Sequence, residues 1–388
     1  MISRRAALRL GAGAVLVGGA GLGWRAWRQG VFSVGHGPAY DAWNTWAQSA
    51  PGSELHLVHA AILAANPHNS QPWAFRVAPG RVDLFADPAR NIGAIDPFRR
   101  EMHIGLGCAL ENLLQGAAAT GWKATLALFP EAGDPSHIAT VALERGPAVA
   151  APLYAAIPIR HTNRGAYEMA CAVPDSALSD LATLGTEFDR IAVRWFATPA
   201  ARRELGAHIV EAAHAIVADR DQSRDSAAWF RDSWDEIQRR RDGLTIDAQA
   251  LPEWLRLAAK VLPPPGSEQA DRVWLAATRD VHVGTAPVFG LLVARDASDN
   301  AQRLEGGRLW QRMHLWATTQ GIAMHPLNQL PERADRERSQ GIEPKFGAVL
   351  AQLVGDGSWQ ALMPFRMGYP TKQALASPRR NVADVVVH

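Results

Sequence analysis

The chain has 388 residues, of which 47% are hydrophobic and 20% charged, and its formal net charge is +2. Such a length accommodates two or three domains with a sizeable core, and the composition is that of a globular protein rather than a disordered one. The small net charge gives no reason to expect nucleic acid as a partner. Cys108 and Cys171 match no metal or redox spacing, and Cys108 lies in an apolar helical stretch, so we expect a buried, inert thiol there.

The first residues resemble a twin-arginine export signal. Arg4 and Arg5 precede a short, weakly apolar, glycine-rich run, residues 10–24, although Ala7 stands where such signals prefer Phe. This run is too short and too weakly apolar for a stable membrane span. We therefore expect residues 1–30 to direct export to the periplasm or cell envelope, with membrane contact through this segment alone. No clear cleavage site follows, so an uncleaved anchor is the alternative.

Periodicity and turn residues predict the following elements in chain order. In the first half we expect a helix at 54–65, a hairpin of strands at 73–78 and 81–86, a long helix from about 99 to 120, and strands at 123–129 and 138–144. In the second half we expect helices at 176–184, 200–219 and 300–320, and strands at 191–196, 287–294 and 362–369. Residues 220–266 are charged and rich in tryptophan, and they are expected to form a helical insertion.

The two halves of the chain echo each other. Aligning Gly107 with Gly307 also aligns Gly121 with Gly321, because both intervals are fourteen residues long. An apolar helix is predicted between the two glycines in each half. We favour a duplication, and the alternative is chance, since a helix that ends at a glycine is common.

A polar turn separates the first predicted helix from the hairpin. Its sequence is Asn66-Pro67-His68-Asn69-Ser70-Gln71-Pro72-Trp73. Amide and hydroxyl side chains in such a turn could hydrogen-bond the polar edge of a planar ring. An Asx-turn or helix cap is the structural alternative, and both uses can coexist.

A second motif places two guanidiniums four positions apart, in Arg160-His161-Thr162-Asn163-Arg164. In an extended segment alternate side chains point the same way, so Arg160, Thr162 and Arg164 could converge on a phosphate. Taken alone, a solvated charged turn is the commoner explanation. Near the end of the chain, Arg379 and Arg380 add two more cations.

Together these motifs resemble the flavin-binding segments of the nitroreductase superfamily, and their occurrence once each in one long chain resembles its Acg-like branch. The resemblance implies an α+β, nitroreductase-like fold with two modules, residues 31–150 and 151–388, fused as a pseudo-dimer with a lid-like insertion at about 220–266. It further implies a monomer. It covers most of residues 50–388 but is specific only at the motifs.

The resemblance also implies FMN as the cofactor. In the family, a backbone N–H after the second long helix faces flavin N5, which points to Leu327 or Asn328, although a simple strand after a helix is the alternative. The FMN contacts that it implies are Asn66, Pro67, His68, Asn69, Gln71, Arg160, His161, Thr162, Arg164, Pro326, Leu327, Asn328, Arg379 and Arg380.

The function expected on this basis is an exported FMN-dependent oxidoreductase. Two electrons would pass from NAD(P)H or another donor through the flavin to a small electrophilic acceptor. No catalytic side chain and no metal are expected, because the cofactor carries the chemistry. One alternative is a protein that binds or sequesters FMN with little turnover, its flavin covered by the insertion. Another is a flavin-free interaction protein on a degenerate scaffold.

Overall fold

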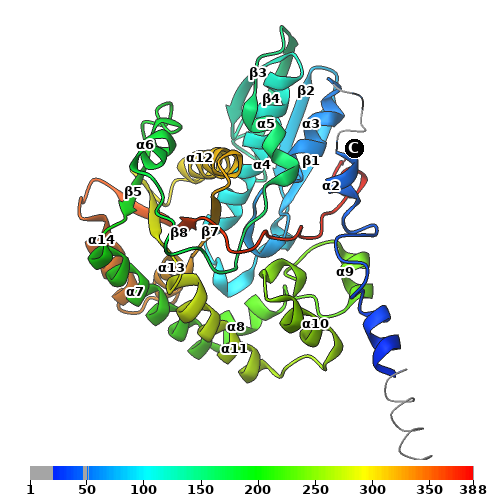
Figure 1. Cartoon of the computed structure of the whole chain (residues 1–388). Coiled ribbons are helices and arrows are strands. Elements are labelled where there is room, and N and C mark those ends of the chain that lie inside the picture. The colour runs from blue at the N-terminus through cyan, green and yellow to red at the C-terminus, as the bar shows by residue number, and fades with distance from the viewer. Residues whose placement is uncertain (1–20, 47–49, 51, 388) are drawn as a thin grey trace, which may run out of the picture.

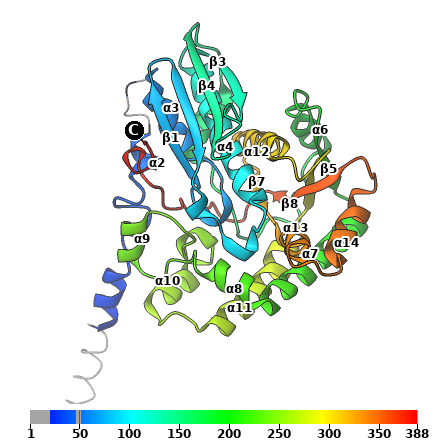
Figure 2. The same cartoon turned by 180° about the vertical axis from the view of Figure 1, so that it is seen from behind.

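The computed structural model describes residues 21–46, 50 and 52–387, so most of the expected signal segment lies outside the described residues. The fold is α+β, with two antiparallel sheets on either side of a central pair of long helices (Figures 1 and 2). Among the described helices, none has the length and apolar character needed to cross a membrane.

The first half forms mostly as the sequence predicts. Its elements are α2 (Asp41–Thr45), α3 (Glu54–Ala61), β1 (Trp73–Ala78), β2 (Arg81–Ala86), α4 (Arg100–Ala119), β3 (Trp122–Leu128), β4 (His137–Arg145) and α5 (Pro152–Ala156), with single helical turns at Pro67–Asn69, Pro88–Arg90, Gly93–Ile95 and Ile157–Ile159. The predicted hairpin has the bounds expected. The sequence predicts a first helix that extends to residue 65, but the helix ends at Ala61, where the chain turns.

The second half contains more helix than the sequence predicts. Outside the insertion its elements are α6 (Asp175–Thr183), β5 (Ile191–Phe196), α7 (Pro199–Ala218), β6 (Val288–Ala294), α12 (Asn300–Thr319), β7 (Ala323–Pro326), α13 (Gln329–Gln340), α14 (Lys345–Val354) and β8 (Gln360–Gly368), with a last turn at Val382–Asp384. Helices α13 and α14 were not predicted. Charged residues fill α13, whose buried face is itself partly polar, so no apolar stripe marks it.

The insertion is helical, as predicted, and continues past residue 266. It contains α8 (Arg220–Ala227), α9 (Trp234–Arg240), a turn at Asp247–Gln249, α10 (Glu253–Val261), α11 (Ser267–Ala276) and a π-helical segment, Ala277–Val283, that leads into β6. Figure 2 shows α8 to α11 below the first sheet. Asp225 anchors α8 to the first half by accepting a 2.8 Å hydrogen bond from the N–H of Ala94.

Each half builds a four-stranded sheet with the same strand order. The orders are β1-β2-β4-β3 and β5-β6-β8-β7, and every pairing is antiparallel. In both halves the long helix follows the second strand, so α4 and α12 occupy equivalent places.

The two long helices touch at a glycine on each. A Cβ added to Gly107 would lie 2.1 Å from the carbonyl oxygen of Leu304, and one added to Gly307 would lie 2.0 Å from that of Ile104. The thiol of Cys108 donates to the carbonyl of Gly307 at 3.3 Å. The helices therefore meet backbone to backbone, which no residue with a side chain would permit.

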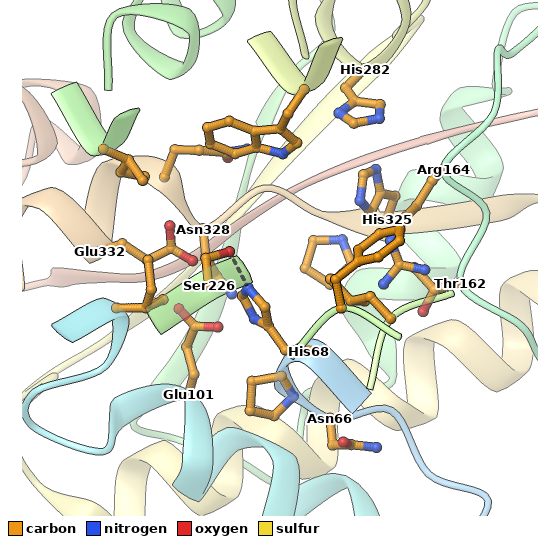
Figure 3. Close-up of a pocket in the computed structure, with 18 of the residues that line it drawn as sticks. Asn66, His68, Glu101, Thr162, Arg164, Ser226, His282, His325, Asn328 and Glu332 are labelled. Atoms are coloured by element: carbon orange, nitrogen blue, oxygen red, sulfur yellow. Dashed lines mark hydrogen bonds between the residues drawn. The ribbon is translucent and has the colours of Figure 1, made fainter. Parts of the chain in front are cut away.

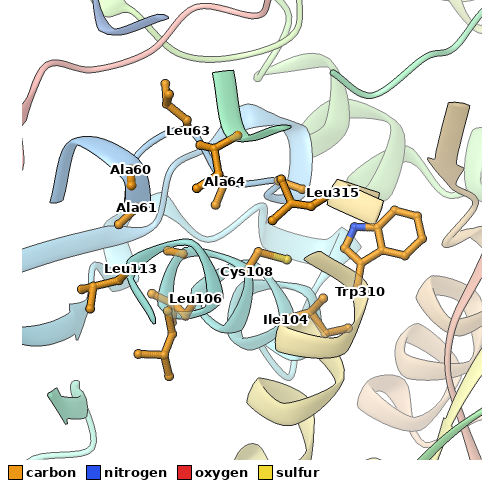
Figure 4. Close-up of a cluster of buried hydrophobic side chains, with 14 of the residues drawn as sticks. Ala60, Ala61, Leu63, Ala64, Ile104, Leu106, Cys108, Leu113, Trp310 and Leu315 are labelled. Atoms are coloured by element: carbon orange, nitrogen blue, oxygen red, sulfur yellow. The ribbon is translucent and has the colours of Figure 1, made fainter. Parts of the chain in front are cut away.

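Apolar side chains from both halves surround this crossing. Figure 4 shows Ile104, Leu106 and Leu113 of α4 beside Trp310 and Leu315 of α12. The Cys108 thiol is buried among them, as expected, and burial raises its pKa. One continuous core thus joins the two halves.

We predict that Gly107→Ala and Gly307→Ala each lower the free energy of unfolding by about 1–3 kcal/mol or more, because the added methyl forces the helices apart. Urea titration followed by tryptophan fluorescence measures this.

Gly116→Ala is the matched control on α4, because its Cβ would make an ordinary 3.4 Å contact with Leu57. Alanine also favours the helix there. Equal stability of all three variants would show that the crossing tolerates a side chain.

Candidate functional site

A cavity of about 330 Å³ opens where the first half, the second half and the insertion meet. The first half contributes the turn at residues 66–68 and one face of α4. The second half contributes residues 325, 326, 328 and 329 and Trp310 of α12, and the insertion contributes α8 and Phe230. Figure 3 shows Arg164 and Thr162 at one end of this cavity, Glu101 and Glu332 at the other, and His68 between them.

The polar turn that borders the cavity has an unusual backbone. His68, Asn69 and Gln71 have positive φ angles of 47°, 55° and 53°. Residues other than glycine rarely adopt this conformation, and where they do the surroundings hold them in place. Asn66 holds the turn in this conformation, because its side-chain oxygen accepts a 2.7 Å hydrogen bond from the N–H of Gln71. The His68 ring reaches Ser226 of α8 at 2.9 Å.

The side chains of Asn69 and Gln71 hydrogen-bond to other parts of the chain. Asn69 donates to the carbonyls of Gly243 in the insertion, at 3.1 Å, and Pro378, at 2.9 Å. The Gln71 oxygen accepts a 2.8 Å bond from the N–H of Arg380. Neither side chain lines the cavity. In this arrangement both side chains tie the insertion and the C-terminal segment to the turn.

The second motif places one arginine at the cavity and one behind it. Arg164 lines the cavity and donates to the carbonyl of Ala248 at 3.4 Å. Arg160 is 2% exposed, donates to the carbonyl of Leu63 at 3.0 Å and lies 3.5 Å from the His314 ring. Loss of hydration lowers the pKa of each guanidinium to about 10, which leaves both charged at neutral pH.

Arg379 adds a third guanidinium to this region. It is 3% exposed, donates to the carbonyl of Ala64 at 3.2 Å, and is hydrogen-bonded to the side-chain oxygen of Asn69. Burial and the charges of Arg160 and Arg164 lower its pKa. The partners that the structure gives these three arginines are neutral groups, and the Nε atoms of Arg160 and Arg379 have no partner among the described residues.

Histidines surround the same end of the cavity and are held neutral. Loss of hydration, followed by the charge of Arg164, lowers the pKa of His68 to about 4. Loss of hydration, followed by the charges of Arg160 and Arg379, lowers the pKa of His161 to about 3. His282, His314 and His325 also have pKa values well below the usual range, chiefly because of burial. At neutral pH the histidines at this end of the cavity are therefore uncharged and the arginines are charged, so the net positive charge favours an anion.

The structure brings half of the predicted FMN contacts to the cavity. Those that line it are Asn66, Pro67, His68, Thr162, Arg164, Pro326 and Asn328. Those that do not are Asn69, Gln71, Arg160, His161, Leu327, Arg379 and Arg380. The N–H of Leu327, one of the two suggested N5 donors, already donates to the carbonyl of Pro364 at 2.8 Å.

Sequence reasoning missed several residues that line the cavity. They are Glu101, Ser226, His282, Trp310, His325, Gln329 and Glu332. A carboxylate near the start of an otherwise apolar helix was a usable signal for Glu101. Nothing in the sequence distinguished Glu332 from the other charged residues of α13.

No family model matches the chain. The chain is 28% identical over 361 residues to the "Putative NAD(P)H nitroreductase Rv3131" of Mycobacterium tuberculosis, which covers 91% of this chain and 95% of that protein. It is 37% identical over 84 residues to the "Putative NAD(P)H nitroreductase acg" of the same organism, covering 22% of this chain and 25% of that protein.

Two solved structures are similar in part. One is the FMN-dependent nitroreductase NfnB from Mycobacterium smegmatis in complex with NADPH, with 19% identity, a TM-score of 0.37, and coverage of 59% of this chain and 94% of that one. The other is the FMN- and NADPH-dependent nitroreductase NfnB from a Sphingopyxis strain, with 16% identity, a TM-score of 0.39, and coverage of 61% and 98%. The alignment with the mycobacterial relative spans nearly the full length of both proteins, so the chain is similar throughout to a protein described as a nitroreductase, which agrees with the superfamily that the motifs resemble.

Proposed function

We propose that the cavity binds FMN and that the protein is an FMN-dependent oxidoreductase of the nitroreductase type. The observation that carries this proposal is the set of arginines at one end of the cavity whose partners are neutral. A buried charge without a counter-charge destabilises a fold, so it is retained where a ligand supplies the opposite charge. The FMN phosphate, close to a dianion at neutral pH, is such a ligand.

The residues present fit the cofactor at both of its ends. Thr162 and Arg164 line the cavity and would hold the phosphate, with the charges of Arg160 and Arg379 behind them. At the other end, buried amide oxygens of Asn328 and Gln329 have no partner among the described residues and would accept hydrogen bonds from the polar edge of the ring. When bound, FMN would supply the two-electron chemistry, and the chain would orient it and keep water from it.

NAD(P)H is the proposed electron donor and a small electrophile the acceptor. The support is the name of the full-length mycobacterial relative, an NAD(P)H nitroreductase by its description.

We also infer that the two halves are modules of one duplicated unit, residues 31–150 and 151–388. The supporting features are the shared strand order and the equivalent helices Arg100–Ala119 and Asn300–Thr319, which touch through reciprocal glycines. Such a chain is a pseudo-dimer and needs no second copy to complete the cavity, so we expect a monomer. Sedimentation analysis of the purified protein tests this expectation.

A second candidate function is FMN binding with little or no turnover. It is favoured by the insertion, because Ser226, Phe230 and Leu244 line the cavity and so limit the room for a nicotinamide beside a bound flavin.

One assay distinguishes the alternatives. The purified protein is examined for a flavin spectrum, and NADH or NADPH oxidation is then followed with and without a nitroaromatic acceptor. Bound FMN with acceptor-dependent oxidation supports the oxidoreductase. Bound FMN without oxidation supports sequestration, and a colourless protein that cannot be reconstituted supports the flavin-free alternative.

Export through the twin-arginine route is a further proposal, and it rests on the sequence that surrounds Arg4 and Arg5. We predict that changing both to lysine keeps the protein in the cytoplasm, as cell fractionation would show. An unchanged distribution would remove this proposal.

Arg164→Ala is predicted to weaken FMN binding by about 1.5–3 kcal/mol, which is the strength of a hydrogen bond to a charged group. Arg160→Ala is predicted to weaken it by a similar amount through the loss of nearby positive charge. Titration of the ligand-free protein with FMN, followed by flavin fluorescence, measures both. Arg240→Ala on α9, which is half exposed and distant in sequence from both motifs, is the control. Unchanged affinity in both Arg160 and Arg164 variants would exclude the phosphate assignment.

The ligand-free protein is predicted to lose stability as the pH falls from about 6.5 to 4. His68 and His161 have folded pKa values of about 4 and about 3, below the 6.5 of an unhindered histidine. Between these pH values the two histidines bind protons in the unfolded chain but not in the folded chain. Each histidine therefore lowers the free energy of unfolding by about 1.4 kcal/mol for every unit by which the pH falls. Urea titrations at several pH values measure the slope. His161→Gln should reduce it, and the exposed His214→Gln on α7 should leave it unchanged.

A further inference from the structure

Two carboxyl groups from different halves of the chain meet at the end of the cavity opposite Arg164. Glu101 belongs to α4 and Glu332 to α13, and they are 3% and 7% exposed. Both line the cavity. Figure 3 shows the two carboxyl groups side by side.

A hydrogen bond between two carboxyl groups requires a proton. An ionised carboxylate has only acceptor atoms, so two ionised carboxylates repel and cannot bond. Because these two buried groups lie side by side, one of them keeps a proton and can donate it to the other. Burial is the main cause that raises the pKa of both groups, that of Glu332 to about 7; the charge of Asp96 also raises both values, and the charge of Arg100 opposes the rise.

The nearest cation does not neutralise the pair. Arg100 donates from Nη2 to Glu101 at 3.4 Å, but its Nε makes a shorter bond to Asp335, at 2.8 Å, and its Nη1 donates to the carbonyl of Leu362 at 3.0 Å. Asp96, which is fully buried, adds another carboxyl group beside Arg100. One guanidinium thus faces several carboxyl groups, and a retained proton is the remaining means of reducing the negative charge.

Other charged groups on the surrounding elements have their own partners. Arg338 pairs with Asp335 at 3.0 Å and is more than half exposed, and Arg303 of α12 donates to the carbonyl of Phe98 at 2.8 Å. Arg333 of α13 pairs with Asp219 of α7 at 3.2 Å.

The cavity wall nearest the insertion brings no cation to the pair either. Asp271 of α11 accepts from Ser223 of α8 at 3.1 Å, and Asp225 of α8 accepts from the N–H of Ala94. His68, with its pKa of about 4, is neutral at neutral pH. With no further cation of the described chain beside the two glutamates, a proton retained on one of them is what reduces their negative charge.

The unpartnered oxygen of Gln329, which is assigned above to the edge of the flavin ring, indicates that a ligand reaches this end of the cavity. Gln329 precedes Glu332 by one helical turn on α13, is 7% exposed, and lines the same cavity. Its side-chain oxygen is buried and has no hydrogen-bond partner among the described residues. A buried acceptor of this kind is normally satisfied, so a bound molecule with a donor group would complete it.

We propose that Glu101 and Glu332 share one proton and deliver it to the electron acceptor bound in the cavity. This step rests on the proposed function. With a quinone, the acceptor would gain a hydride from reduced FMN and a proton from the pair, which together give the hydroquinone. An O–H bond of the pair breaks as an O–H bond of the product forms, and water then returns the proton to the pair. A proton donor is most effective when it titrates near the working pH, which suits this pair.

The shared proton can be tested without cofactor. Infrared spectra of the ligand-free protein near pH 6 should show a protonated carboxyl C=O band, and Glu101→Gln or Glu332→Gln alone should each shift or abolish it, because the proton no longer has a second carboxylate to bind. Glu111→Gln is the matched control, since Glu111 is a buried carboxylate on the same helix but is paired with Arg308 at 3.1 Å and Arg312 at 2.8 Å. If the carboxyl band of both Gln variants is the same as that of the Glu111→Gln control, the two glutamates do not share a proton.

The delivery step is tested with the FMN-loaded protein by measuring the two half-reactions separately. Each Gln variant should slow oxidation of the reduced protein by a quinone by about 10²–10⁴-fold and remove the loss of rate above neutral pH. Reduction by NADPH should be unchanged, because it takes no proton from the pair. Slowing of both half-reactions alike, or an unchanged pH profile, would overturn proton delivery. A wild-type protein that binds no FMN would instead overturn the proposed function, and the infrared result would stand separately.

Discussion

The contact between α4 and α12 at Gly107 and Gly307 fixes the distance between the two halves, and the cavity depends on that distance. Ile104 and Cys108 of α4 and Trp310 of α12 all line the cavity within about one turn of the crossing. A side chain at either glycine would separate the helices and so move these walls. The reciprocal form of the contact, with each glycine against a carbonyl three residues before the other, is what a twofold-related pair of helices produces.

The cavity carries opposite charge preferences at its two ends. At the Arg164 end, guanidiniums with neutral partners and histidines that refuse protons favour an anion. At the other end, the shared proton between Glu101 and Glu332 reflects an excess of carboxyl groups over cations. An elongated ligand with a phosphate at one end and a hydrogen-bonding ring at the other matches this polarity in one orientation only. The same asymmetry would place a reacting molecule next to the acidic end.

Sequence periodicity predicted the hairpin and the two long helices because their apolar residues recur at regular intervals with clear turn residues between them. It also indicated which two segments would meet at the cavity. It could not indicate which side chains of the 66–71 turn would face inward, because three of those residues adopt left-handed backbone conformations that reverse the expected directions. The sequence also could not indicate that Arg160 lies behind the cavity wall, since the local chain turns its side chain toward the carbonyl of Leu63. Glu332 lies on a helix whose buried face is partly polar, where no apolar stripe marks the inward side.

The insertion is bound to the site by the turn that the sequence motif marks. Asn69 donates to the carbonyl of Gly243, and His68 reaches Ser226 across the cavity. Because both contacts begin at residues with strained backbone conformations, the conformation of the turn and the position of the insertion depend on each other. A ligand that alters the turn would therefore also move the cover of the cavity.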